Sequence, residues 1–222
     1  CGHNCVVVPL TYLLDTVGWN RVVSRRPITY AYFSCPWKNP WFRLIDSRWY
    51  ELDERYQNIP VDDLMAFIGC CWFMPTAYFL KGLKGLNTHD FGNFAENQEI
   101  ALKTWLGGGR MVLNKNVWCA HWKQKNSERN YSISKSAIYH SQSLVAKYFI
   151  YHQWPHQVHD FSWLVDKFWP LPTDGGQKQT YPNKKLLIVT DIPDPNFIKL
   201  LTKRDRNISV LQCGRKRTLV EL

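Results

Sequence analysis

Two glutamates near residue 97 are the side chains in this sequence best suited to proton transfer. Glu96 and Glu99 are three residues apart, and Asn97 lies between them. Apolar residues recur at helical spacing after them, which predicts a helix over residues 97–106. Both carboxylates then lie on neighbouring faces near the start of this helix, where the helix dipole favours negative charge. One of them can act as a general base, although acidic residues in a first turn are more often caps or solvated charges.

A histidine, a glycine and a tryptophan elsewhere in the chain could contact a ligand. His121 lies in the aromatic run WCAHW (118–122), either as a metal ligand or as a buried histidine with a satisfied hydrogen bond. Gly69 and Trp72 belong to the apolar run 67–74, which has the composition of a strand covered on both faces. The glycine would permit a ligand to approach the backbone closely. The tryptophan would be either an apolar platform for a sugar or a core side chain.

Strands and helices that alternate along the chain are expected to position these residues. The predicted strands are residues 6–8, 67–74 and 110–113, and further helices are expected within 134–154 and from Phe161 after an Asp160 N-cap. We expect the strands to form one mixed sheet with the helix 97–106 packed against it. Three glycines, 107–109, end this helix, and the next strand returns towards its start. The sequence therefore predicts that Glu96, Glu99 and His121 converge on one cleft.

The composition is that of a globular protein with a strongly basic surface. The chain has 222 residues, of which 45% are hydrophobic, and a formal net charge of +10. These values argue against a disordered chain and favour anionic partners: sugar nucleotides, phosphorylated lipids or nucleic acid. No apolar run is long enough to span a membrane. The cysteines number seven, without a paired framework, which indicates reduced thiols and a cytoplasmic location.

Residues 18–50 alternate aromatic and basic side chains. Such interleaving can stack nucleobases and neutralise phosphates. It is equally typical of β-structure with one buried aromatic face, and residues 28–33 have that period. We favour the sheet. No RNA-binding or helix-turn-helix signature accompanies the charge, so the interpretation as a nucleic-acid-binding protein rests on composition only.

The end of the sequence indicates a second domain. Residues 174–184 are polar, with two glycines and a proline, and are expected to form a linker. Residues 185–222 predict the beginning of a second, Rossmann-like α/β domain. Its predicted elements are a strand at 186–189, a helix from Pro195 and a strand at 209–213.

Several short motifs follow one another in a characteristic order. Residues 95–99 (AENQE) look like a Trp-Gly-Gly-Glu-Asn-x-Glu motif that opens a helix. Residues 103–105 (KTW) and the three glycines after the helix match a Lys/Arg-x-Trp and a Gly-Gly that follow this motif. Residues 69–75 and 79–86 are similar to two runs that precede it. Together these motifs resemble the C-terminal half of the catalytic domain of bacterial and phage family 2 glycosyltransferases, which have the GT-A fold. They are also related to motifs of polypeptide N-acetylgalactosaminyltransferase-like enzymes.

The resemblance implies a truncated GT-A domain over residues 1–173, an α/β mixed sheet with flanking helices. It implies transfer of a sugar from a nucleotide-diphospho-sugar donor to a hydroxyl of a glycan, lipid or protein acceptor. Glu96 or Glu99 would be the catalytic base. His121 would be one ligand of a divalent cation, Mn or Mg. The residues that would bind the sugar or the acceptor are Gly69, Trp72 and Asn97.

One part of the family's pattern is missing. No Asp-x-Asp metal motif lies in residues 1–60. We therefore expect the chain to lack the nucleotide-binding half, to be inactive alone and to bind UDP weakly. Two other functions stay open: a non-catalytic carbohydrate-binding or scaffold half, and a basic nucleic-acid-binding protein.

Overall fold

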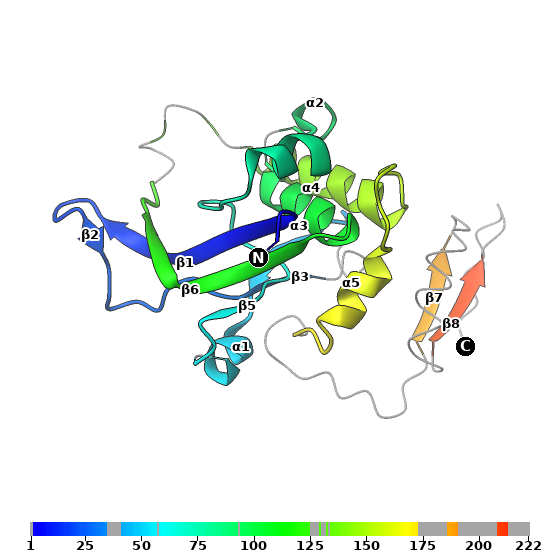
Figure 1. The fold of residues 1–222 in the computed structure, drawn as a ribbon. Helices are drawn as coiled ribbons and strands as arrows, with labels where there is room; N and C mark the ends of the chain where they lie inside the picture. Colours follow the sequence, from blue (N-terminus) through cyan, green and yellow to red (C-terminus); the bar gives the residue numbers. More distant parts are fainter. Residues whose placement is uncertain are drawn as a thin grey trace. The chain divides into compact units, whose positions relative to one another are not determined.

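A computed structural model describes residues 2–34, 41–56, 58–92, 94–124, 129, 132, 134–172, 186–190 and 208–212. The chain divides into two units, Cys1–Asp174 and Gly175–Leu222 (Figure 1). The elements of the first unit are β1 (Cys5–Asp15), β2 (Asn20–Arg21), β3 (Ala31–Phe33), β4 (Asp46–Arg48), α1 (Tyr50–Arg55), β5 (Val61–Asp63), the π-helix η2 (Tyr78–Gly82), α2 (Thr88–Phe91), α3 (Glu96–Leu106), β6 (Arg110–His121), α4 (Lys135–Ile150) and α5 (Phe161–Lys167).

Strands β1 and β6 form the centre of a four-stranded mixed sheet with the order β2-β1-β6-β5. β1 and β6 run parallel, and β2 and β5 pair antiparallel with them at the two edges. The apolar side chains Val6, Val8, Met111 and Leu113 are buried, as expected of central strands in a sheet that is covered by helices. The predicted mixed sheet is therefore present, and both central strands are longer than the sequence indicated.

The predicted strand at residues 67–74 is wrong. Within this run only Phe73 pairs with a strand, through a single bridge to Val7 in which both N···O distances are 2.8 Å. Gly69 has a φ of +47°, outside the extended region, so the run bends there. Phe73 itself is exposed. The strand beside β6 is instead β5, whose sequence VDD carries no apolar signal.

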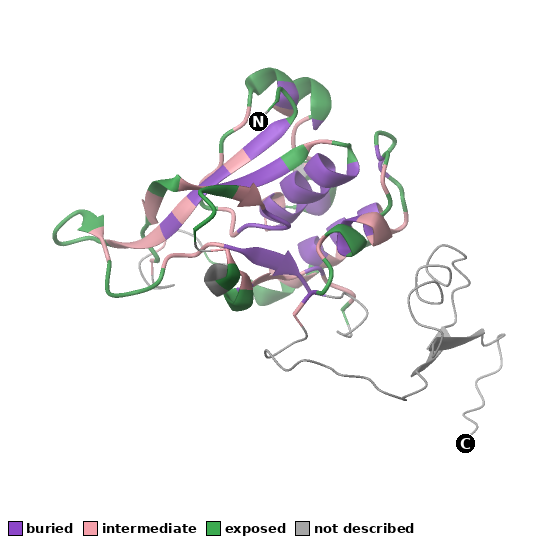
Figure 2. Ribbon diagram, turned by 60° about the horizontal axis from the view of Figure 1, so that its bottom comes forward, coloured by how far each residue is buried: buried purple, intermediate pink, exposed green. Residues whose placement is uncertain are grey.

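Helix α3 confirms the predicted helix and begins at Glu96. Every residue from Asn97 to Leu106 is buried, because α3 contacts β6, α4 and α5 (Figure 2). The ring of Trp105 packs edge-on against Phe168, with centroids 5.3 Å apart.

Helices α4 and α5 confirm the other two predicted helices. The Asp160 carboxylate caps α5 by accepting a hydrogen bond from the backbone N–H of Trp163 at 2.8 Å. In the described part of the chain, no helix has the length and apolarity to cross a membrane.

Part of the aromatic and basic stretch, around β3 and β4, forms core structure. β3 and β4 pair antiparallel, and all three residues of β3 are buried. Tyr30 and Trp49, which flank these strands, are buried as well. The preference for β-structure over nucleobase stacking is confirmed for these residues.

The second unit contains two described strands, β7 (Leu186–Thr190) and β8 (Ile208–Gln212), which pair in parallel. They correspond to the two strands predicted there. The predicted linker and the predicted helix from Pro195 lie outside the described residues, so the β-α-β unit stays a prediction.

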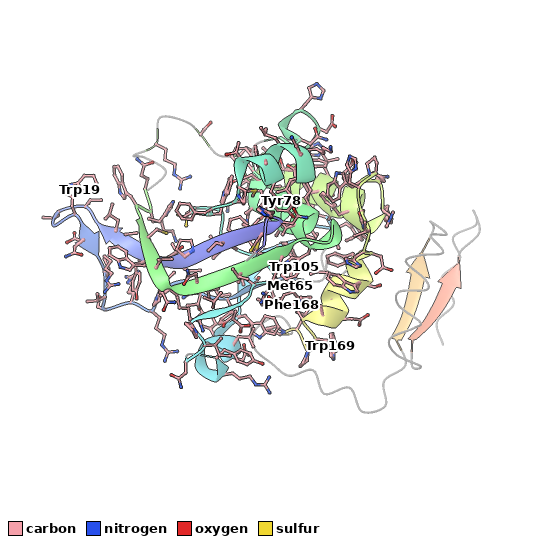
Figure 3. The ribbon with its side chains drawn as sticks, viewed as in Figure 1. Trp19, Met65, Tyr78, Trp105, Phe168 and Trp169 are labelled. Carbon is pink, nitrogen blue, oxygen red and sulfur yellow. The ribbon has the colours of Figure 1, made fainter. Side chains whose placement is uncertain are left out.

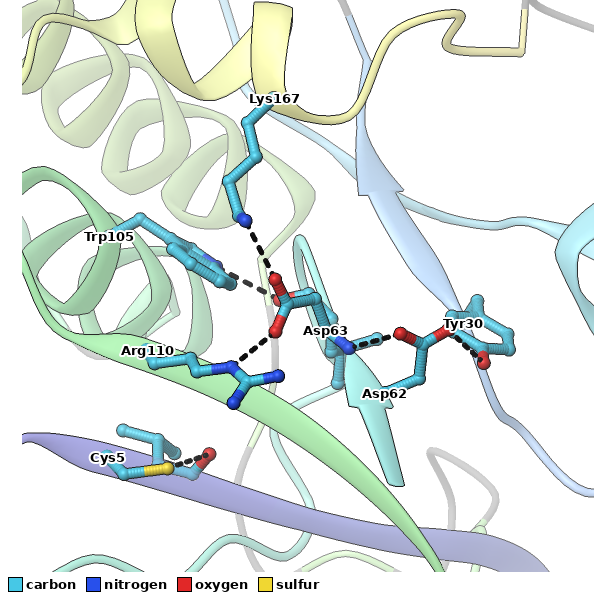
Figure 4. A network of polar contacts seen from close by, with 9 residues as sticks. Cys5, Tyr30, Asp62, Asp63, Trp105, Arg110 and Lys167 are labelled. Atoms are coloured by element: carbon cyan, nitrogen blue, oxygen red, sulfur yellow. Dashed lines mark hydrogen bonds and ion pairs between the residues drawn. The ribbon is translucent and has the colours of Figure 1, made fainter. Parts of the chain in front are cut away.

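Asp63, at the end of β5, joins strands and helices of the first unit (Figure 4). Arg110 Nε lies 2.6 Å from one carboxylate oxygen and Lys167 Nζ lies 2.7 Å from the other. On the next residue, the carbonyl of Leu64 accepts a hydrogen bond of 3.0 Å from Trp105 Nε1. Burial alone would raise the pKa of Asp63, but the hydrogen bonds and charges of Lys167 and Arg110 lower it overall. The ionised Asp63 therefore holds β5 against β6 and α5.

We predict that this clamp makes the protein acid-sensitive. Because the pKa of Asp63 is below its ordinary 3.8 in the folded chain, the clamp stabilises at neutral pH, and this contribution is lost as the pH falls through 3.8 and below. Asp63→Asn should cost about 1–2 kcal/mol at pH 7 and less at pH 3, since two partly exposed ion pairs are lost. Urea unfolding at both pH values measures this. An Asp63 pKa at or above 3.8 in a carboxyl NMR titration would contradict it.

Candidate functional site

The first turn of α3 brings Glu96 and two amide side chains to Asp46 of β4. Gln98 Nε2 donates a hydrogen bond of 2.6 Å to Asp46 Oδ1, and Asn97 also hydrogen-bonds this carboxyl group. Asn97 Nδ2 in addition donates to the carbonyl of Phe67 at 2.8 Å, which fixes the start of the helix to the bend before Gly69. Glu96 is half-buried and close enough to act on Asp46 electrostatically.

Asp46 differs from an ordinary surface aspartate in its affinity for a proton. Burial raises the pKa of the Asp46 carboxyl, the charge of Glu96 raises it further, and the hydrogen bonds from Asn97 and Gln98 lower it, with a net rise. Gln98 Oε1 is buried and has no hydrogen-bond partner in the described part of the chain. A carboxyl group with a raised pKa beside a second carboxyl group is an arrangement that can serve acid–base chemistry.

Gly69 gives the site its shape. Its φ of +47° is one that L side chains rarely adopt. A Cβ atom at this position would lie 3.4 Å from Glu96 Oε1 and 3.3 Å from Asn97 Cβ. The backbone therefore approaches the first turn of α3 at a distance at which a side chain would crowd it. The structure brings together three of the residues singled out from the sequence: Gly69, Glu96 and Asn97.

Glu99 is not brought together with them. Its carboxylate is buried and lies 2.6 Å from Lys103 Nζ, and it accepts a hydrogen bond of 2.7 Å from the backbone N–H of Asn87. Lys103 donates a further bond of 2.8 Å to the carbonyl of Gly85. The predicted convergence of both glutamates on one cleft is therefore wrong for Glu99, because this carboxylate is held by a buried cation and a loop.

Three free thiols continue the site from Gly69 towards β6. The hydroxyl of Thr11 on β1 lies 3.5 Å from the sulfur of Cys70 and 3.4 Å from that of Cys119. Burial and the neighbouring sulfurs of Cys119 and Cys70 raise the pKa of Cys71 to about 11. Burial also raises the pKa of Cys70, so the thiols of Cys70 and Cys71 are protonated and poor nucleophiles at neutral pH.

The sequence-based expectation of reduced thiols is wrong for Cys5. Cys5 is disulfide-bonded, whereas Cys70, Cys71 and Cys119 are free.

His121 lies at the far end of β6, exposed and in register with Leu13 of β1. Because side chains alternate along a strand, His121 shares a face with Cys119, which contacts the same threonine as Cys70. The predicted convergence of His121 with Glu96 therefore stays a prediction.

The described residues do not fit a complete metal site. They contain no group of three or more His, Cys, Asp or Glu side chains placed to hold a metal ion. His121 would supply one ligand, and Mn or Mg prefers several oxygen ligands. The predicted divalent cation is therefore not supported by the geometry, and the role of His121 as a ligand stays a prediction.

Trp72 packs on the protein itself. Its ring stacks on Phe79 with centroids 6.1 Å apart and an interplanar angle of 29°, and it contacts the hydrophobic core. A polar cavity of about 250 Å³ lies elsewhere, beside the Lys103 side chain, and is lined in part by Lys84, Tyr148 and Trp154. Neither Glu96 nor Gly69 lines this cavity.

Asp46 is the functional candidate that sequence reasoning missed. It lies fifty residues before Glu96, in a short polar strand, and no local pattern marks it. The thiols near Thr11 were visible as cysteines, but nothing in their spacing places positions 70 and 119 together.

Comparisons with known proteins give little more. No family model and no curated protein matches the chain. Among solved structures, the chain is similar to a crystal structure of GalNAc-T7 with UDP, GalNAc and Mn²⁺, at 14% identity and a TM-score of 0.43. The match covers 62% of this chain and 26% of that one, so the chain spans about a quarter of that protein's length. A likeness at this level decides nothing about the chemistry of this chain.

We predict that the two glutamates differ sharply in their effect on stability. Glu99→Gln leaves Lys103 buried without a counter-charge and should cost about 3–5 kcal/mol. Glu96→Gln, at a half-buried position with no ion pair among the described residues, should cost about 1 kcal/mol or less. Urea unfolding followed by tryptophan fluorescence measures both. The double variant Glu99→Gln/Lys103→Met should regain much of the loss. Equal losses for the two single variants would mean that the ion pair does not stabilise the fold.

We also predict that Asp46 lowers stability at neutral pH. Its folded-state pKa is raised above 3.8, so the folded chain retains a proton that the unfolded chain releases. Stability then falls as the pH rises above 3.8 towards the raised value. Asp46→Asn removes this cost and should raise the melting temperature at pH 7. The exposed Glu51→Gln is the matched control and should change nothing. A lower melting temperature for Asp46→Asn would show that the carboxylate is stabilising.

Proposed function

We propose that the chain belongs to a glycosyltransferase and binds the sugar of a nucleotide-diphospho-sugar at the start of α3. The observation that carries the proposal is the half-buried Glu96 beside Asp46, a carboxyl group with raised proton affinity, at a bend that Gly69 keeps free of a side chain. The motif resemblance at residues 95–99 supports it independently of the geometry. The fold agrees at the level of a mixed α/β sheet with flanking helices.

In this proposal Glu96 is the general base. Its carboxylate takes the proton of an acceptor hydroxyl as the hydroxyl oxygen bonds to the anomeric carbon of the sugar. The bond from that carbon to the diphosphate breaks, and its electron pair leaves with the diphosphate. Asp46 and Asn97 hold the helix start in place through their mutual hydrogen bond and the Asn97 bond to Phe67. Glu99 has a structural role, because its carboxylate is paired with the buried Lys103. The proposal therefore names Glu96 alone as the base.

A second candidate is a carbohydrate-binding half without catalysis. The absence of a complete metal group among the described residues favours it, because a leaving diphosphate needs a positive partner for rapid transfer. Both functions use the same sugar contact and differ only in turnover.

We predict that nucleotide sugars contact the chain through the sugar ring. Saturation-transfer NMR with a panel of UDP-sugars should show this contact. Glu96→Ala should weaken it at least about tenfold, since a hydrogen bond to a charged group is worth about 1.5–3 kcal/mol. Glu51→Gln, an exposed glutamate on α1, is the control and should bind normally.

A UDP-release assay with hydroxyl acceptors then separates the two candidates. Release that Glu96→Gln lowers by more than about a hundredfold supports transfer with Glu96 as the base. Sugar contact without release agrees both with the non-catalytic candidate and with the expectation that this chain is inactive alone. Absence of any sugar contact would contradict both candidate functions, the transferase and the non-catalytic carbohydrate-binding half.

A further inference from the structure

Exposed apolar side chains gather at one end of the sheet, away from the start of α3. Among the described residues, fourteen large hydrophobic side chains are exposed. Six of them lie in or directly after the β1–β2 hairpin and at the end of β6: Val17, Trp19, Val23, Val117, Trp118 and Trp122. Val17 and Trp19 are the extreme members, with 93% and 76% of their surface exposed. Isolated exposed apolar residues are ordinary, whereas a gathering of this kind marks an interaction surface.

The two segments form one surface. Leu13 of β1 is in register with His121 of β6, and Leu14 of β1 with Arg21 of β2. The Arg21 guanidinium lies over the ring of Trp118, 4.7 Å from its centroid, and so connects β2 to β6. Figure 1 shows the β1–β2 turn projecting beyond the body of the unit, and Figure 2 shows it as exposed over its whole length.

The turn is built to hold its apolar residues outward. The two carboxylate oxygens of Asp15 accept hydrogen bonds from the backbone N–H groups of Val17 and Gly18, at 3.0 and 3.2 Å. Trp19 has a φ of +49°, a conformation that is unfavourable for a large side chain. A bulky, exposed residue in a strained conformation at a fixed turn is a mark of function rather than of packing.

The charge of this segment selects the partner. Residues 15–26 contain three arginines, Arg21, Arg25 and Arg26, against one aspartate, whose carboxylate is engaged in the turn. A basic surface with exposed tryptophan fits either nucleic acid or an anionic lipid surface. Three of the six apolar residues are valines, which cannot stack on bases but do enter the boundary between headgroups and acyl chains. Tryptophan prefers that same boundary.

We propose that this surface docks the protein onto an anionic membrane, with Val17 and Trp19 inserted at headgroup depth and the arginines bound to lipid phosphates and carboxylates. This is attachment to a lipid surface by a turn, and it needs no membrane-spanning helix. It goes beyond the proposed sugar transfer and does not depend on it.

Vesicle flotation of the full 222-residue chain tests the proposal. The chain should float with phosphatidylcholine vesicles that contain phosphatidylserine, and much less with phosphatidylcholine alone. The double variant Val17→Ser/Trp19→Ser should weaken binding at least about tenfold, because it removes the inserted apolar residues. Arg25→Ala/Arg26→Ala should abolish the preference for anionic vesicles and the sensitivity to salt.

The control is a second exposed tryptophan in the same unit. Trp169 is 64% exposed and lies beyond α5, far from Trp19 in Figure 3. Trp169→Ser should bind vesicles like the unchanged chain. Circular dichroism and thermal melting verify that each variant is folded. Three results would overturn the proposal: no flotation with anionic vesicles, an equal loss for Trp169→Ser, or binding of single-stranded RNA through Trp19 without binding of vesicles.

Discussion

The ion pair between Glu99 and Lys103 is the interaction on which the arrangement of the candidate site depends. Both side chains are almost completely buried, so their desolvation must be offset by good geometry and by further hydrogen bonds. The backbone N–H of Asn87 and the carbonyl of Gly85 supply these bonds. The pair therefore fixes the first turns of α3 to the loop before α2, and with them the direction in which Glu96 points.

Glu96 and Glu99 thus lie within one turn of α3 but in different environments. Glu99 faces a buried cation, whereas Glu96 faces a glycine backbone and a second carboxyl group. The two buried amides between these glutamates hold the first turn in this orientation. Asn97 donates a hydrogen bond to the carbonyl of Phe67, and Gln98 donates one to Asp46. A sequence pattern that places two carboxylates three residues apart cannot distinguish these roles, since both positions are compatible with a solvated first turn.

Sequence reasoning succeeded where local pattern and tertiary environment agree. Helix α3 has apolar residues at helical spacing and glycines at its end, and its boundaries were predicted almost to the residue. It failed at residues 67–74, where an apolar run bends at Gly69 instead of extending. It also missed β5, because Asp63 is held in a strand by Arg110 and Lys167 from distant parts of the chain. Asp46 was invisible for the same reason.

The net charge of the chain overstates the positive charge that is available to a partner, because ion pairs within the fold neutralise some of the cations. A formal charge of +10 suggests a phosphate-binding protein, yet several cations are used within the fold. Lys103 neutralises Glu99, and Arg110 and Lys167 share Asp63. Cations that lie beside exposed apolar residues, as Arg21 does beside Trp118, can direct a partner to a defined surface. The position of a charge relative to buried and exposed neighbours, and not the total, therefore carries the functional information.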